Sequence, residues 1–177
     1  LGYEPQMSKA KIQKCYTQLA KDFAVLPFQE VLEHCRKLIK KYYSCYPLVF
    51  HMGVLLVNHA MLAEKPEDTM EVLEEAKALF AHVKTRAEEP ELGKNALQME
   101  AYCLLALKRP SEVLDFLEED SFSVGPMEPL LASAYQMLGN TKEARRVLQI
   151  GIYKEVISLY NLLASYMNLP WKHKEEF

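Results

Sequence analysis

Residues 131–151 read LASAYQMLGNTKEARRVLQIG and predict two helices joined by a tight turn. Ala132 and Tyr135 lie three positions apart, so their side chains share one face of a helix. Gly139 ends that helix, because glycine readily adopts the left-handed conformation found just after a helix. Thr141 then starts a second helix, whose apolar residues again follow a helical period. The segment therefore predicts one unit of a helical repeat.

A small residue followed three positions later by a bulky one recurs at five places. A small residue lets a neighbouring helix approach closely, and the bulky residue on the same face fills the next gap. The small residues are 33, 48, 31 and 32 positions apart, and three of these gaps are close to the roughly 34-residue period of helix-turn-helix repeats. We therefore expect an all-α fold, a right-handed superhelix of about nine helices in antiparallel pairs with a concave inner face. The five pairs are Ala20 with Phe23, Gly53 with Leu56, Ala101 with Leu104, Ala132 with Tyr135, and Ala164 with Met167.

The composition describes a folded protein with little net charge. The chain has 177 residues, of which 50% are hydrophobic, and a net charge of -3. This weakly acidic balance argues against binding nucleic acid by its phosphates and against a polybasic membrane site. The longest apolar stretch, 46–63, is interrupted by His51, Asn58 and His59, so it predicts a buried helix rather than a membrane span. The four cysteines form no C-x-x-C pair, which favours reduced thiols in a cytoplasmic protein.

Proline, glycine and small polar residues divide the chain into helices. Ser8 and Ser111 are suited to cap helices, and Pro47 and Pro90 stand at first-turn positions. One domain is expected over 1–177, in which 1–7 is a linker from a missing N-terminal DNA-binding domain and 170–177 is a tail. The expected helices run from Ser8 to about 25, then over 28–43, 47–63, 68–88 and 90–108, a short one after Ser111, 127–138, one from Thr141, and a last one at about 155–168.

The helix pair at residues 131–151 resembles a tetratricopeptide repeat. It has the large-small pair, the aromatic, the Leu-Gly turn and the later small and bulky residues of that family, although no proline ends its second helix. These positions are Leu131, Ala132, Tyr135, Leu138, Gly139, Ala144, Val147, Leu148 and Gly151. The chain also resembles the tetratricopeptide-like C-terminal domain of Xre-type helix-turn-helix transcription regulators from Firmicutes, in its opening LGYEPQMSKAKIQKCYTQLAKDFA and its core segments.

The second resemblance implies a function in regulation. It implies an effector-binding and oligomerisation domain, which contacts DNA only through the missing N-terminal domain and forms a homodimer. The helix at 155–168 supports a dimer, because it has no packing partner among the expected helices. The alternative is a general scaffold for protein–protein interaction with no link to DNA. An N-terminal helix-turn-helix domain in the whole protein would separate the two.

The repeat pattern also predicts a ligand-binding groove. Tetratricopeptide repeats place the first helix of each pair on the concave face, where amide side chains can hold a peptide backbone and aromatic rings can hold apolar side chains. In the alternative interpretation Asn58 bonds to a neighbouring helix and the groove is only a packing seam. The candidate residues are Phe50, Val54, Asn58, Gln98, Tyr102, Gln136, Asn161 and Ser165.

No residue pattern points to catalysis, a cofactor or a metal. There is no nucleophile motif and no glycine-rich phosphate loop. His51 and His59 are eight positions apart, whereas metal ligands on one helix lie three or four apart. The methionines occur at core spacing and predict packing, and the charged run 71–77 predicts a solvated helix face.

Overall fold

The computed structural model describes residues 5–119 and 127–169, and these are almost entirely helical. They form eight α-helices and one short 3-10 helix, with no strand among them, which confirms the all-α prediction. None of the helices in this part of the chain combines the length and the apolarity that a membrane span requires. The α-helices are α1 (Lys9–Val25), α2 (Phe28–Lys41), α3 (Tyr46–His59), α4 (Pro66–Arg86), α5 (Pro90–Ala106), α6 (Pro110–Glu119), α7 (Glu128–Met137) and α8 (Thr141–Met167); η1 (Ala60–Leu62) is the 3-10 helix.

The expectation of about nine helices is wrong, because the described residues hold eight. The predicted break between Thr141 and the helix at 155–168 does not occur, and α8 continues for 27 residues. No proline interrupts this stretch, and one glycine inside a helix, Gly151, costs only about 1 kcal/mol relative to alanine.

Most helix ends follow from local residue chemistry. Proline is the first residue of α4, α5 and α6, where its missing N–H would have no partner anyway. Ser111 is therefore the second residue of α6 and not its cap. Gly139 has a φ of 76° directly after α7, as the prediction of a helix stop there requires. The third helix is shorter than expected, because after His59 the chain tightens into η1.

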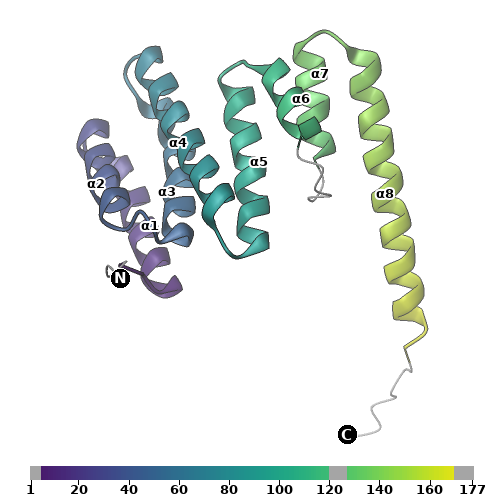
Figure 1. Ribbon diagram of the computed structural model, residues 1–177, viewed down its shortest axis with the longest axis horizontal. Coiled ribbons are helices and arrows are strands. Elements are labelled where there is room, and N and C mark those ends of the chain that lie inside the picture. Colours follow the sequence, from purple (N-terminus) through teal and green to yellow (C-terminus); the bar gives the residue numbers. More distant parts are fainter. Residues whose placement is uncertain (1–4, 120–126, 170–177) are drawn as a thin grey trace, which may run out of the picture. The chain divides into compact units, whose positions relative to one another are not determined.

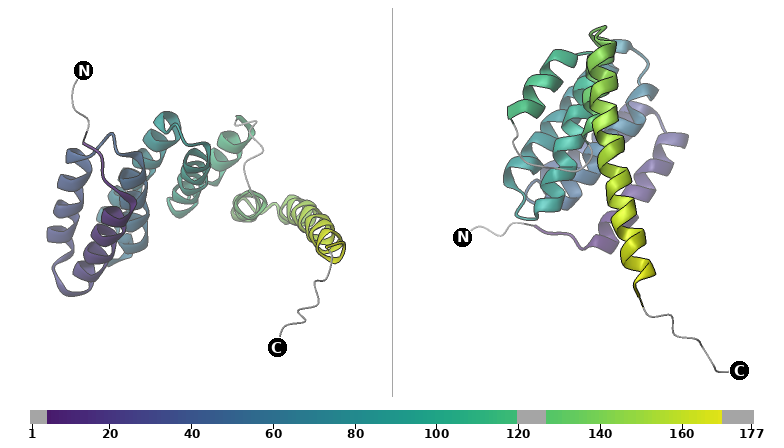
Figure 2. Two further views of the ribbon diagram at one scale, coloured as in Figure 1. Left: turned by 90° about the horizontal axis from the view of Figure 1, so that it is seen from below. Right: turned by 90° about the vertical axis from the view of Figure 1, so that its right-hand side faces the viewer.

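The contacts divide the chain into two compact units, Leu1–Gly125 and Pro126–Phe177. In the first unit, each helix from α1 to α6 contacts the next one in the chain. α1, α2 and α3 form a group, and α4, α5 and α6 follow to one side of it (Figure 1). α3 also contacts α5, and Figure 2 shows these helices from two other sides. The core lies between these helices; its largest fully buried side chains include Phe80, Leu32, Leu48, Met52 and Leu55.

Gly53 of α3 lies against the side chain of Phe80 in α4. A Cβ atom at this position would stand 2.8 Å from the ring of Phe80, which is far inside van der Waals contact. Phe80 is fully buried, so its ring has no free space into which it can move. At Gly53 the small residue of the repeat pattern therefore allows a neighbouring helix to pack closely, as the sequence predicts.

The charged run on α4 does more than face solvent. Arg36 of α2 donates to Glu75 at 2.8 Å and to Glu71 at 3.4 Å. Arg109, in the turn before α6, donates to Glu74 at 2.7 Å. These bonds connect α4 to α2 and to the turn before α6, so the charged run does not only face solvent. Within the run, Lys77 pairs with Glu74 at 2.5 Å.

The second unit consists of α7 and α8. The buried residues of these two helices are Ala132 and Ala134 of α7 and Ala144 and Val147 of α8, and the small alanine side chains permit close packing. α7 has 10 residues and α8 has 27, so α8 continues well beyond the end of α7 (Figure 1).

The two helices are also joined at the first residue of α7. Lys154 donates to Glu128 at 2.7 Å, and this hydrogen bond is the main cause that lowers the pKa of the Glu128 carboxyl. Gly151 allows the approach, since a Cβ there would lie 3.0 Å from the Cβ of Glu128.

Candidate binding surfaces

The first unit contains an apolar hollow, which we call the α3–α5 hollow. It has a volume of about 630 Å³ and lies at the end of α3, beside η1, the start of α4 and the end of α5. This volume is within the roughly 300–1,000 Å³ range of ligand sites. Its apolar lining includes Val57, Ala60, Met61, Met70, Leu73 and Tyr102.

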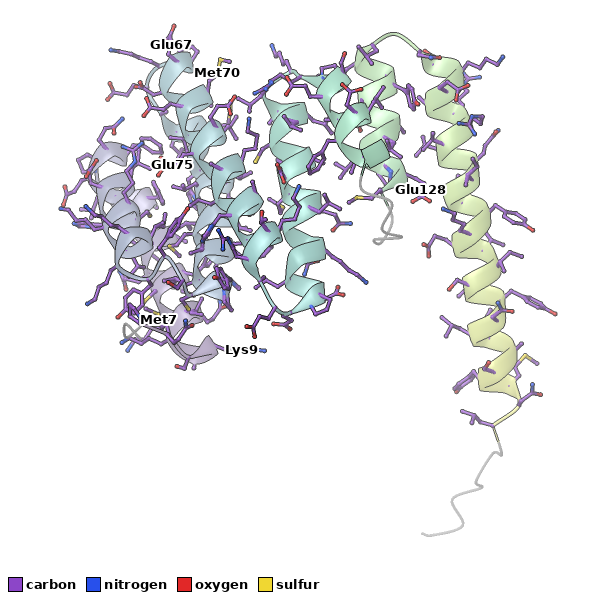
Figure 3. The ribbon with its side chains drawn as sticks, viewed as in Figure 1. Met7, Lys9, Glu67, Met70, Glu75 and Glu128 are labelled. Carbon is purple, nitrogen blue, oxygen red and sulfur yellow. The ribbon has the colours of Figure 1, made fainter. Side chains whose placement is uncertain are left out.

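The hollow is open because α3 ends early. The tight turn of η1 leaves Met61 82% exposed, and Met70 on the first turns of α4 is 54% exposed. Figure 3 shows Met70 at this free end of α4. Methionine side chains are flexible and polarizable, so they adapt to apolar partners of different shape. The prediction that the methionines pack in the core is therefore wrong for Met61, and it is also wrong for Met137 and Met167, which are 46% and 72% exposed.

The polar groups of the hollow carry one charge of each sign. Glu64 and Lys108 line it, and the hydroxyl of Thr69, which also lines it, donates to the Lys65 carbonyl at 3.4 Å. Lys108 has a φ of 59°, in the left-handed region that side chains other than glycine rarely adopt. The hollow thus suits apolar side chains rather than a strongly charged ligand.

Only one of the eight candidate groove residues lines this hollow. It is Tyr102, which is 48% exposed. Asn58 is exposed, and its amide donates to the Tyr16 hydroxyl at 3.2 Å, so it makes the interhelical bond of the alternative interpretation. Phe50 packs edge-on against Phe80, with ring centroids 5.6 Å apart.

The other five candidates are divided between the two units. Val54 of α3 and Gln98 of α5 are half-buried within the first unit. Gln136 and Asn161 belong to the second unit, as does Ser165, whose hydroxyl donates to the Asn161 carbonyl at 2.8 Å.

The C-terminal part of α8 presents the largest set of exposed apolar side chains on any single helix described. We call residues 156–167 the α8 overhang. The overhang contains no charged residue, and none of its large apolar side chains is buried. These side chains expose on the order of 1,000 Å² in total, above the roughly 300–600 Å² of the largest apolar patch on a typical monomer. They are Val156, Ile157, Leu159, Tyr160, Leu162, Leu163, Tyr166 and Met167.

A narrow polar stripe runs along the overhang. Ser158, Asn161 and Ser165 are spaced by three and four positions, so they lie on one face of the helix. The helix turns 100° per residue, so the apolar side chains outside this stripe cover an arc of roughly 240° around the helix axis. A helix at a protein surface usually has an apolar stripe only slightly wider than about 100°.

The cysteines and histidines form no reactive centre among the described residues. Burial raises the pKa of the Cys35 and Cys103 thiols to about 12, so neither is a thiolate at neutral pH. His51 and His59 are half-buried, and each ring nitrogen Nδ1 pairs with a backbone carbonyl of its own helix. Residues 5–119 and 127–169 contain no group of three or more metal-ligating side chains that could hold an ion.

Comparison with known proteins finds no family model, no curated protein and no solved structure that matches this chain. The two apolar surfaces are therefore the features from which a function can be inferred.

Proposed function

We propose that this chain is an effector-binding and oligomerisation domain of a bacterial transcription regulator, and that it acts in the cytoplasm. In this proposal the helices form a right-handed superhelix of antiparallel pairs. The chain binds other protein surfaces and catalyses no reaction. The resemblance to Xre-type regulators supports the regulatory setting, and DNA is contacted only by a separate N-terminal domain.

The observation that carries this proposal is the α8 overhang. A helix that exposes on the order of 1,000 Å² of apolar surface is unfavourable in water, because each Å² of apolar area costs roughly 25 cal/mol while it stays exposed. Stable protein interfaces bury about 800 Å² on each partner, so the overhang alone is large enough for one. We therefore propose that the chain forms a homodimer through α8.

The effector part of the proposal concerns α3 and α5. Phe50, Val54 and Asn58 of α3 and Gln98 and Tyr102 of α5 are its candidate contacts, and a short peptide with apolar side chains is the ligand class that the adjoining hollow suits. Phe50 and Tyr102 supply aromatic surface, and the two amides can each donate and accept hydrogen bonds.

Light scattering of the whole chain tests the homodimer. We expect the measured mass to double as the concentration rises, and Leu162→Glu to keep the chain monomeric. Leu162 is 66% exposed, so glutamate does not disturb the folded chain, but burying its charge at an interface weakens the dimer by at least about 100-fold in Kd. Ser158→Glu is the matched control, since it adds the same charge to the polar stripe and should leave dimerisation unchanged.

A chain that stays monomeric at high concentration would contradict the homodimer. If the whole protein carries no helix-turn-helix domain, the general scaffold replaces the transcription regulator as the function of the same surfaces.

A further inference from the structure

The width of the apolar arc restricts what can cover the α8 overhang. A single helix packed alongside covers a stripe of about 100°, whereas the arc spans roughly 240° at 100° per residue. A straight pairing of two α8 helices would thus leave much of this surface in water. A concave surface that receives several side chains at once would cover more of the overhang than a second straight helix does.

The α3–α5 hollow is such a concave surface, and the same chain carries it. Three helices and η1 contribute to it, so its walls can contact more than one side of an inserted helix. Its volume of about 630 Å³ is enough for two or three apolar side chains one turn apart, such as Leu159 and Leu163. Insertion of an apolar helix face into a groove is a common mode of recognition.

We propose that two copies exchange their overhangs, so that the α8 overhang of each copy lies in the α3–α5 hollow of the other. This inference rests on the proposed homodimer and names the surface that receives α8.

The charges of the two surfaces favour this pairing over a charged partner. The overhang contains no charged residue, and the hollow has Glu64 and Lys108, whose charges cancel. Neither surface therefore brings a net charge into the interface, where an uncompensated charge is costly. The polar stripe of Ser158, Asn161 and Ser165 can remain in water.

Reciprocity also explains why association would stop at two copies. When each copy gives an overhang and receives one, both surfaces of both copies are covered, and the contact closes on itself. A one-way contact between the same surfaces would leave a free overhang and a free hollow, and would add further copies into a filament.

Complementation between two variants tests the exchange. Met70→Glu charges the hollow, and Leu162→Glu charges the overhang, so each variant alone has no intact contact. A mixed pair keeps one, because the normal overhang of the Met70→Glu chain meets the normal hollow of the Leu162→Glu chain. We expect each variant alone to dimerise at least about 100-fold more weakly than wild type, and the mixture to regain dimers by light scattering.

Val25→Glu is the control for Met70→Glu, because Val25 is a 78% exposed apolar residue at the end of α1 and lies outside the hollow. It should dimerise like wild type. A Met70→Glu chain that dimerises normally would overturn the exchange but leave the homodimer standing. Two monomeric variants whose mixture stays monomeric would overturn the exchange as well. A wild-type chain that is monomeric at every concentration would overturn both proposals.

Discussion

At Gly53 the backbone of α3 lies against the buried ring of Phe80. An added Cβ would come within 2.8 Å of that ring, and interiors packed as densely as crystals cannot absorb such an overlap without moving a helix. The absence of a side chain at Gly53 therefore allows the Phe80 ring to lie against α3. The sequence pattern of small residues predicts this role, and Gly53 is the position where the contact is tightest.

Gly53→Ala should lower the free energy of unfolding by about 1–3 kcal/mol, the usual cost of overpacking a core. Urea denaturation followed by circular dichroism measures this change. The matched control is Gly93→Ala, also inside a helix, where the new Cβ would lie 3.8 Å from the Lys84 carbonyl. There the removal of glycine should stabilise the chain by up to about 1 kcal/mol. Equal effects of the two substitutions would show that Gly53 has no packing role.

α8 shows at the scale of one element how far the sequence predicts the structure. Its start at Thr141 is predicted correctly, and the Asn140 side chain caps it by accepting a bond from the Glu143 N–H at 3.2 Å. The repeat pattern also predicts a separate last helix at about 155–168, whereas α8 is continuous from Thr141 to Met167. No residue near Gly151 ends the helix. The local residue chemistry therefore predicts the length of α8 better than the repeat pattern does.

The bond between Lys154 and Glu128 makes the α7–α8 contact dependent on pH. It lowers the pKa of the Glu128 carboxyl in the folded chain below the value in the unfolded chain. Its stabilisation is therefore present above the unfolded pKa, near 4.3, and is lost as the pH falls through the folded pKa. Lys154→Met should raise the pKa of Glu128 toward its ordinary value in an NMR titration, and cost less than about 1 kcal/mol at neutral pH because the lysine is exposed. Lys142→Met, on the same helix, should leave that pKa unchanged.

The α3–α5 hollow could not be predicted from the sequence, except for Tyr102. Its residues come from separate parts of the chain, and Met61 and Met70 follow the same helical spacing as buried methionines do. Their exposure depends on where α3 ends and on how α4 begins beside α5, which is tertiary information. The α8 overhang was more predictable, since its apolar residues have no partner in the repeat pattern.

At the scale of the whole molecule, the proposals connect effector binding to association. Tyr102 lines the hollow and is also a candidate effector contact, so a ligand that holds this side chain competes with an inserted overhang. Two sites that share one residue are coupled, and each ligand weakens the other by the same factor.

Association should also make thermal stability depend on concentration. Only the folded chain presents the overhang and the hollow, so association stabilises the folded state over the unfolded state. The Tm of the wild-type chain should rise with concentration, and the Leu162→Glu chain should show one constant Tm. Differential scanning calorimetry at several protein concentrations measures this, and a wild-type Tm that does not change with concentration would contradict the prediction.

Met61 is the most exposed of the large apolar residues that line the hollow, at 82%, and Met70, which also lines it, is 54% exposed. Peroxides convert such methionines to sulfoxides, which are polar and chiral, and reductases reverse the reaction. Oxidation of these two sulfur atoms would place polar S–O groups in the α3–α5 hollow, which otherwise suits apolar side chains. Oxidising conditions, as well as the protein concentration, would then determine what fraction of the chains is paired.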